Sequence, residues 1–323
     1  MSRARAPLAR RPSRLPGPGR PGRGRLRTGA AAWLPILLFA VASPLFEGKA
    51  ADPEPDEPVL TFVARSRPPR ALALSALVAA CGERVVEVDD PYHARPMRYR
   101  ALPLRCVLDR GFEDRGGAAS LAQESLLLRA RDGYTRPASG ALVADANAFL
   151  AFGEPGLEAG RDRQGRALPA FSPIDRRQID PAPFYLVWTG VQHGDPHEHP
   201  WPYQLVTIEI APFEDAFPHT VPAGLPDSDP GWRGYALFQE ACSACHAING
   251  EGGKVGPDLN VPMSIVEYRP LAQIRAYVRD PQATRYTSMP AHPHLTTADL
   301  DALIAYFEAM RVRKHDPRSG AKP

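Results

Sequence analysis

The stretch Cys242-Ser243-Ala244-Cys245-His246 decides how the last quarter of this 323-residue sequence folds. It directly follows residues 231–241, whose composition predicts a helix. In a C-x-x-C-H pattern each thiol can add to a vinyl group of haem, and the adjacent histidine then lies beneath the iron as an axial ligand. The motif therefore predicts one covalently attached haem c, with His246 coordinating its iron.

Two other uses of a C-x-x-C pair fit this sequence less well. A thiol–disulfide redox pair normally follows a strand and opens a helix, as in thioredoxin. A structural zinc site needs further cysteine or histidine ligands at matching spacing, and residues 229–323 contain no second cysteine pair. Haem attachment is the remaining interpretation.

The residues around this motif predict helices. Asp229 can cap the helix at 231–241, and a second helix is expected at residues 271–279. Thr296 with Asp299 resembles a capping box that opens a third helix. Apolar residues spaced for one face of that helix are Leu300, Leu303, Ile304, Phe307 and Met310.

Residues 231–310 resemble class I c-type cytochromes. In that family an N-terminal helix with a glycine and an aromatic residue crosses the C-terminal helix. The residues matching this crossing are Gly234, Tyr235 and Phe238 on one helix and Tyr306 and Phe307 on the other. The stretch Gly256-Pro257-Asp258-Leu259 matches the family's G-P-x-L turn. The resemblance implies that the Pro257 carbonyl accepts a hydrogen bond from the second ring nitrogen of His246 and tunes this ligand.

The sixth iron ligand must come from later in the chain. Met289 lies in Ser288-Met289-Pro290, between the last two predicted helices, and the family places its methionine ligand in such an M-P loop. His292 and His294 close by are alternatives, as are Met263 and an open sixth position. Met263 is expected to pack around the haem, and Met310 lies on the apolar face of the final helix. We therefore predict iron ligation by His246 and Met289.

The first 50 residues predict export. They contain ten lysines and arginines but a single acid, Glu47, and the apolar stretch 30–46 follows the basic part, as in a secretory signal. Because the whole chain has a formal charge of +3 and this segment +9, residues 51–323 carry −6. That balance argues against a nucleic-acid partner. We expect a periplasmic protein, either cleaved after Ala50 or anchored to the inner membrane by residues 30–46.

Short apolar runs predict a second domain ahead of the haem motif. Expected strands are at residues 59–63, 85–88, 126–130, 148–152, 184–188 and 204–210. Asp132-Gly133 suits a tight turn, and Val206, Ile208 and Ile210 alternate as one buried face should. The chain therefore reads as multidomain. A β-rich α+β domain is expected at 55–212, a Pro-rich linker at 213–230, an all-α cytochrome domain at 231–312 and a disordered tail at 313–323.

Several phrases of residues 55–212 resemble the molybdopterin-binding fold of the sulfite oxidase family, including MRYRALPLRCVLDRG around Cys106 and RDGYTRPASG around Tyr134. That family ligates molybdenum through one cysteine. By resemblance, Cys106 lies in a segment that follows the ligand cysteine, so we expect a domain that kept the fold and lost the metal. Cys81 reads as a small buried residue. Pairing of Cys81 with Cys106 in an oxidising compartment is the alternative.

Four residues at 193–199 form another candidate metal site. His193, Asp195, His197 and His199 lie in the phrase HGDPHEH, where neighbouring imidazoles can converge on a metal ion. The prolines and acids around them favour a solvated connection instead.

Together these features predict an electron-transfer protein and not an enzyme. A monohaem cytochrome would pass single electrons between redox partner proteins, such as a periplasmic dehydrogenase or oxidase, in a respiratory chain. The alternative is a molybdenum-pterin oxidoreductase fused to its own cytochrome c electron acceptor.

Overall fold

The computed structural model describes residues 57–158, 160–161, 167–174, 178–190, 196 and 198–319. These residues all fall within one compact unit, Asp52–Pro323. The predicted signal or anchor at residues 1–50 lies outside the described residues. Among the helices that are described, none has the length and apolar character needed to cross a membrane.

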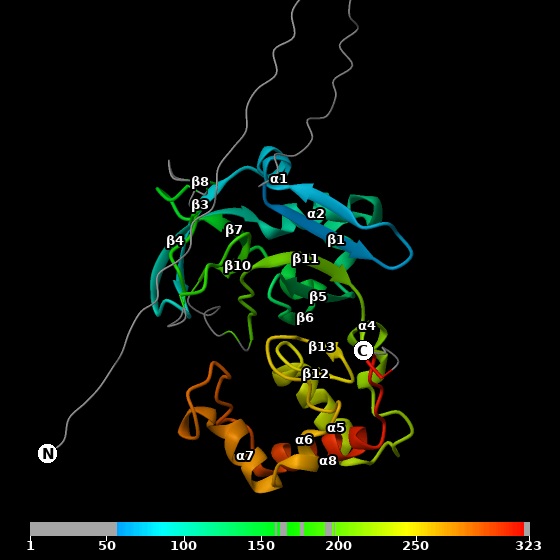
Figure 1. Ribbon diagram of the computed structural model, residues 1–323. Coiled ribbons are helices and arrows are strands. Elements are labelled where there is room, and N and C mark those ends of the chain that lie inside the picture. Colours follow the sequence, from blue (N-terminus) through cyan, green and yellow to red (C-terminus); the bar gives the residue numbers. More distant parts are fainter. Residues whose placement is uncertain are drawn as a thin grey trace, which may run out of the picture. The chain divides into compact units, whose positions relative to one another are not determined.

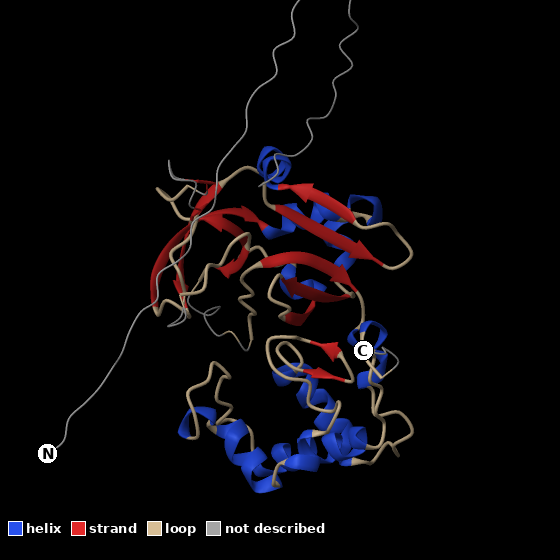
Figure 2. Ribbon diagram, in the orientation of Figure 1, coloured by secondary structure: helices blue, strands red, loops and turns tan. Residues whose placement is uncertain are grey.

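The first half of the described chain is rich in β-sheet (Figures 1 and 2). A five-stranded sheet has the order β2 (Arg70–Ala73), β1 (Val59–Ala64), β11 (Leu205–Ile210), β5 (Ser125–Ala130) and β6 (Thr135–Ser139). A four-stranded antiparallel sheet has the order β10 (Tyr185–Trp188), β7 (Ala148–Gly153), β4 (Arg95–Pro103) and β3 (Arg84–Asp90). In the five-stranded sheet only β1 and β11 run parallel.

Shorter elements complete this sheet-rich part. They are α1 (Leu74–Cys81), α2 (Leu104–Gly111), η1 (Glu113–Arg115), η2 (Gly117–Leu121), α3 (Gly140–Val143), β8 (Gly160–Arg161) and β9 (Ala167–Leu168). One apolar core includes residues of both sheets and of α1 and α2, with Trp188, Tyr99 and Tyr185 among its largest buried side chains.

All six predicted strands are present, but the longer strands β2, β4 and β6 were missed, as were the two-residue strands β8, β9, β12 (Ala247–Ile248) and β13 (Glu251–Gly252). The last two form a short hairpin within residues 231–312, which were expected to be all-α. β4 is central in its sheet and buries Met97, Tyr99 and Ala101 in alternation. Its prolines, Pro96 and Pro103, read against a strand because proline donates no ladder hydrogen bond.

The alternation expected along β11 holds only in part. Ile208 and Ile210 are buried, but Val206 is only partly so. The pairing with β5 shifts between Leu205 and Thr207, and such a bulge moves the preceding residues out of phase. Leu205 is buried in place of Val206.

The last part of the chain is mainly helical (Figure 2). Its elements are α4 (Phe213–Ala216), η4 (Pro218–Thr220), α5 (Pro230–Leu237), η5 (Phe238–Cys242), β12 (Ala247–Ile248), β13 (Glu251–Gly252), α6 (Ile265–Tyr268), α7 (Leu271–Arg279), η6 (Pro281–Ala283) and α8 (Thr297–Arg311). The turn η5 is π-helical and carries the chain from α5 into the C-x-x-C-H motif.

The predicted helix caps are confirmed. The Asp229 carboxylate accepts a hydrogen bond from the Gly231 amide at 2.8 Å, where α5 begins. At the start of α8, the Asp299 amide donates to the Thr296 hydroxyl, and the Thr296 amide donates to the Asp299 carboxylate at 2.9 Å. Both caps satisfy amides that a helix leaves unpaired.

Helices α5 and α8 cross at Gly234. A Cβ atom there would lie 2.0 Å from the Ala302 carbonyl oxygen, so only glycine permits this approach. The Tyr306 ring of α8 packs against Tyr235 and Phe238, with centroid separations of 5.6 and 5.4 Å. The aromatic pairing implied by the cytochrome resemblance is therefore present.

Residues 213–230, predicted as a linker, contain α4 and η4 and contribute to the helical core. Phe213 and Phe217 of this segment, together with Leu127 of β5, belong to the apolar cluster that contains Tyr306. The Tyr306 hydroxyl also donates to the Thr220 carbonyl at 2.7 Å. One apolar cluster thus includes residues from the sheet, the segment after it and the helices.

Cys81 is bonded to Cys106 and is not the free buried thiol that we expected. The first lies at the end of α1 and the second within α2, and the two helices pack against each other. The pairing depends on this packing, which cysteines 25 residues apart do not reveal in sequence.

Candidate haem site

One cavity of about 350 Å³ brings together the residues singled out in the sequence. Cys242, Cys245, His246 and Met289 all line it, and so does Pro257. Its apolar walls include Leu259, Ile265, Ile274, Val278, Leu303 and Phe307. A thiol pair, an imidazole and a thioether around an apolar space fit a haem with two thioether links and two axial ligands.

The two cysteines of the motif are free thiols, with Cys242 buried and Cys245 partly exposed. Burial, with a smaller contribution from Cys245, raises the pKa of Cys242 to about 12. A thiol–disulfide exchange pair needs a thiolate and therefore a lowered thiol pKa. The environment of Cys242 raises its pKa instead, so this thiol is not suited to thiol–disulfide exchange.

The ring of His246 is held in place by the loop that follows the motif. Its Nδ1 lies 2.8 Å from the Pro257 carbonyl oxygen, which is the contact implied by the cytochrome resemblance. As the carbonyl can only accept, Nδ1 carries the proton and Nε2 keeps a free lone pair. Burial lowers the pKa of His246, which favours the neutral imidazole that binds metals.

Glycine is required where the next loop passes the imidazole. A Cβ atom at Gly256 would lie 2.5 Å from Cε1 of His246. The Gly256 amide also donates to the Cys245 carbonyl at 2.7 Å. The loop at Gly256 therefore packs directly against the His246 imidazole and is hydrogen-bonded to the motif.

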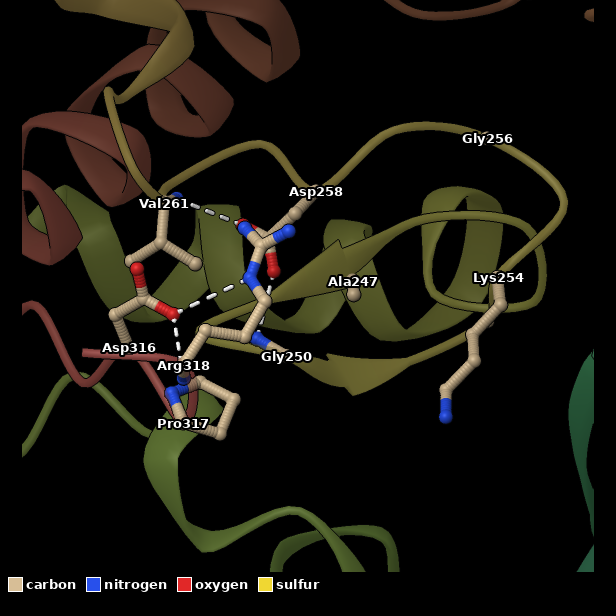
Figure 3. A pocket seen from close by; sticks show the side chains of 10 residues that line it. Ala247, Gly250, Lys254, Gly256, Asp258, Val261, Asp316, Pro317 and Arg318 are labelled. Carbon is tan, nitrogen blue, oxygen red and sulfur yellow. Dashed lines mark hydrogen bonds and ion pairs between the residues drawn. The ribbon is translucent and has the colours of Figure 1, made fainter. Parts of the chain in front are cut away.

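A second cavity, of about 240 Å³, lies among the residues that follow the motif (Figure 3). The Asp258 carboxylate in its wall accepts hydrogen bonds from the amides of Gly250 and Val261, at 2.6 and 2.9 Å. These contacts fix the loop from β12 to Val261, so we assign Asp258 a structural role.

The other candidate ligands have different environments. His292 is buried and lines the main cavity, whereas His294 is exposed and does not. Met310 is buried in the apolar cluster around Tyr306. Met263, expected to pack around the haem, is 53% exposed and is not among the residues that line the main cavity. Met289 is the methionine that lines the cavity, and its amide donates to the Thr287 hydroxyl at 3.2 Å.

The sequence reading missed two arginines that line the cavity, Arg269 and Arg285. The Arg285 Nε donates to the Tyr277 hydroxyl at 2.9 Å, and neither arginine forms an ion pair with a carboxylate of the described residues. Guanidinium groups suit carboxylates, and haem carries two propionates. The sequence contained a signal for them, because residues 269–285 hold four arginines and one acid, whereas residues 51–323 as a whole carry a charge of −6.

The histidine-rich phrase at 193–199 gives no metal site in the described part of the chain. His193, Asp195 and His197 lie outside the described residues. The His199 ring packs against Trp188, with ring centroids 4.9 Å apart. Where side chains are described, no group of three or more potential metal ligands of the His, Cys, Asp or Glu type was found.

Comparison with known proteins supports the haem assignment. Residues 232–311 match the family model Cytochrome c. An 88-residue segment is 33% identical to cytochrome c oxidase subunit 2 of Alkalihalophilus pseudofirmus, covering 25% of each chain. A 68-residue segment is 41% identical to lupanine 17-hydroxylase (cytochrome c) of a Pseudomonas species, covering 21% of this chain and 9% of that protein. This chain thus spans a quarter or less of these relatives.

Proposed function

Because residues 232–311 form a class I c-type cytochrome domain, we propose that this chain carries one covalent haem c and transfers single electrons. The observation that carries this proposal is the cavity in which Cys242, Cys245, His246 and Met289 meet. When bound there, haem supplies a one-electron ferric–ferrous couple.

Each of these residues has a defined task in the proposal. Cys242 and Cys245 hold the haem through thioether bonds, and His246 and Met289 ligate its iron. The Pro257 carbonyl keeps the His246 ring in one tautomer and increases its basicity. The soft sulfur of Met289 favours ferrous iron and so raises the reduction potential. The apolar walls exclude water and act in the same direction.

Arg269 and Arg285 are proposed to neutralise the haem propionates. Both line the cavity, and neither is committed to a carboxylate of the described residues. A cation close to the haem also disfavours the more positive ferric state, as like charges repel. These arginines would therefore both orient the haem and raise its potential.

The proposed setting is the periplasm, in a redox or respiratory chain. The basic and then apolar segment at residues 1–50 supports export, and the charge of −6 on residues 51–323 supports a protein partner over nucleic acid. Redox partner proteins, such as a dehydrogenase or an oxidase, would supply and accept the electrons. In this proposal residues 30–46 are either removed by cleavage after Ala50 or anchor the protein to the inner membrane.

For residues 55–212 we propose a molybdopterin-type fold that has lost its metal. The sulfur of Cys106 is bonded to Cys81, and a disulfide sulfur is not the thiolate that molybdenum needs. The second candidate function is an oxidoreductase fused to its own cytochrome. It is favoured by one relative, which is named both a hydroxylase and a cytochrome c.

Two measurements on the exported protein test these proposals. A denaturing gel stained for haem peroxidase activity should show a band that survives acid–acetone extraction, because thioether links resist it. Haem lost on extraction would contradict covalent attachment. Metal analysis should find one iron and no molybdenum per chain. One molybdenum per chain would instead support the fused oxidoreductase.

A further inference from the structure

The sheet-rich part of the chain contacts the haem-attachment motif directly. Residues 132–135, which form the turn after β5 and the first residue of β6, lie beside the loop that carries β12 and β13 (Figure 1). The Thr135 amide donates to the Ala244 carbonyl at 3.0 Å, inside the C-x-x-C-H motif. The Lys254 amide donates to the Gly133 carbonyl at 3.1 Å.

Side chains reinforce this contact. The Arg136 guanidinium donates to the Glu240 carbonyl at 2.6 Å, two residues before Cys242. Gly133 has φ of +93°, and a Cβ atom there would lie 2.9 Å from the Lys254 Cβ. Both its conformation and its contact with Lys254 therefore require glycine at the tip of the turn. The turn and the motif are held in one fixed arrangement.

Three tyrosines of the sheet-rich part gather on the Cys245 side of the motif. Tyr134 lies in the turn itself, and the rings of Tyr92 and Tyr203 are 5.8 Å apart. Burial is the largest cause of the raised pKa values of Tyr92 and Tyr134, and electrostatic interaction with Cys245 adds to both. Tyr134 immediately precedes Thr135, whose amide is hydrogen-bonded to the Ala244 carbonyl, so the backbone places Tyr134 beside the residue that precedes Cys245.

The backbone around Tyr92 is fixed from within the sheet core. The buried Asp90 carboxylate accepts hydrogen bonds from the amides of Tyr92 and His93, at 2.8 and 2.9 Å. The same carboxylate accepts from the hydroxyls of Tyr99 and Tyr185, at 2.8 and 2.9 Å. Tyr92 nevertheless keeps 40% of its surface exposed. It is an anchored aromatic side chain with a face still available for contact.

We propose that the sheet-rich part forms a cover over the haem edge on the Cys245 side, with Tyr92 and Tyr134 against that edge and residues 132–135 fixing its position. This inference rests on covalent haem attachment at Cys245. Aromatic rings there exclude water, and lower solvent access at a haem raises its potential. The cover also directs small redox reagents to other parts of the haem periphery.

The test compares the Tyr92→Ala/Tyr134→Ala double variant with the wild-type holoprotein. Ferricyanide should oxidise the ferrous double variant several-fold faster, and the midpoint potential should fall, because the edge becomes accessible to solvent. The Tyr92→Phe/Tyr134→Phe variant keeps both rings and should behave like wild type. Tyr286→Ala removes a fully exposed tyrosine and serves as the matched control.

Unchanged oxidation rate and potential in the alanine double variant, with haem attached and far-ultraviolet circular dichroism preserved, would overturn the cover. Gly133→Val provides a second route if the double variant does not fold, because its side chain should displace the turn from Lys254. It should show the same faster oxidation. Failure of the proposed function is a different result, since wild-type protein would then carry no covalent haem at all.

Discussion

The chain contains two pairs of cysteines, which differ in their spacing, their environment and their bonding. Cys242 and Cys245 are free thiols three positions apart on one segment, and both face an apolar cavity. Cys81 and Cys106 are 25 positions apart, belong to two packed helices and form a disulfide. Local spacing identifies the first pair, whereas only the tertiary fold brings the second together. Substitutions in each pair should therefore affect either haem attachment or the stability of the fold, but not both.

The largest expected effect is on haem attachment. Cys245→Ser should abolish one thioether link, and Cys242→Ser/Cys245→Ser should remove covalent haem entirely. Cys106→Ser should leave haem attachment intact, because that sulfur is bonded to Cys81 and lines no haem cavity. Haem staining after denaturing electrophoresis measures all three. Equal haem loss in Cys106→Ser would show that the two pairs are not independent.

Met289→Ala should leave the haem attached but remove one axial ligand of its iron. The ferric protein should lose the weak far-red charge-transfer band of sulfur ligation, and its potential should fall by part of the roughly 0.8 V range that axial ligands span. Met263→Ala is the control, since Met263 is 53% exposed and lies outside the cavity. If Met263→Ala removes the band while Met289→Ala keeps it, Met263 is the ligand.

Removing the disulfide should affect stability and not haem chemistry. For a loop closed by residues 25 positions apart, chain entropy predicts a loss of about 3.5 kcal/mol in the free energy of unfolding for Cys81→Ser/Cys106→Ser. Chemical denaturation followed by circular dichroism measures this loss, and the haem spectrum should stay unchanged. A stable variant with an altered potential would assign the disulfide a redox role instead.

Arg285→Leu should lower the haem potential by tens of millivolts, because a cation near the haem disfavours ferric iron. A shift of about 30 mV in a one-electron couple corresponds to roughly 0.7 kcal/mol. Arg279→Leu makes the same charge change on α7 but outside the cavity lining, so its shift should be smaller. Equal shifts would mean that the arginines act only through overall charge.

The smallest effect concerns acid stability at the start of α8. Hydrogen bonds from Thr296, and then from Arg233, lower the pKa of Asp299 to about 2. Its ionised form therefore stabilises the fold above about pH 4, and this contribution is lost as the pH falls towards 2. Asp299→Asn should be less stable at neutral pH and should lose less stability on acidification. Unfolding midpoints at several pH values measure the difference.

Features set by neighbouring residues were predictable from the sequence. The caps at Asp229 and Thr296 and the apolar stripe of α8 each lie within about three helical turns. Their outcomes in the structure agree with the sequence reading. The Pro257 contact with His246 came from family resemblance, and the structure contains it at 2.8 Å.

Features set by distant contacts were not predictable in this way. β4 was missed because its prolines argue against a strand. The bond between Cys81 and Cys106 depends on the packing of α1 against α2, which the sequence does not reveal. The basic stretch 269–285 was visible in the sequence, but only the fold shows that Arg269 and Arg285, among its four arginines, line the cavity. The predicted domain boundaries, the export signal and the iron ligands remain predictions.

Leu127, Phe213 and Phe217 bear on how this haem module can be inherited or transplanted. They lie outside residues 231–312, yet they belong to the apolar cluster of α5 and α8. A gene segment beginning at residue 231 would specify a protein whose helices expose the surface that these side chains now cover. Recombination at that boundary would therefore have to replace three apolar side chains at once, so the module and its neighbour are expected to evolve together.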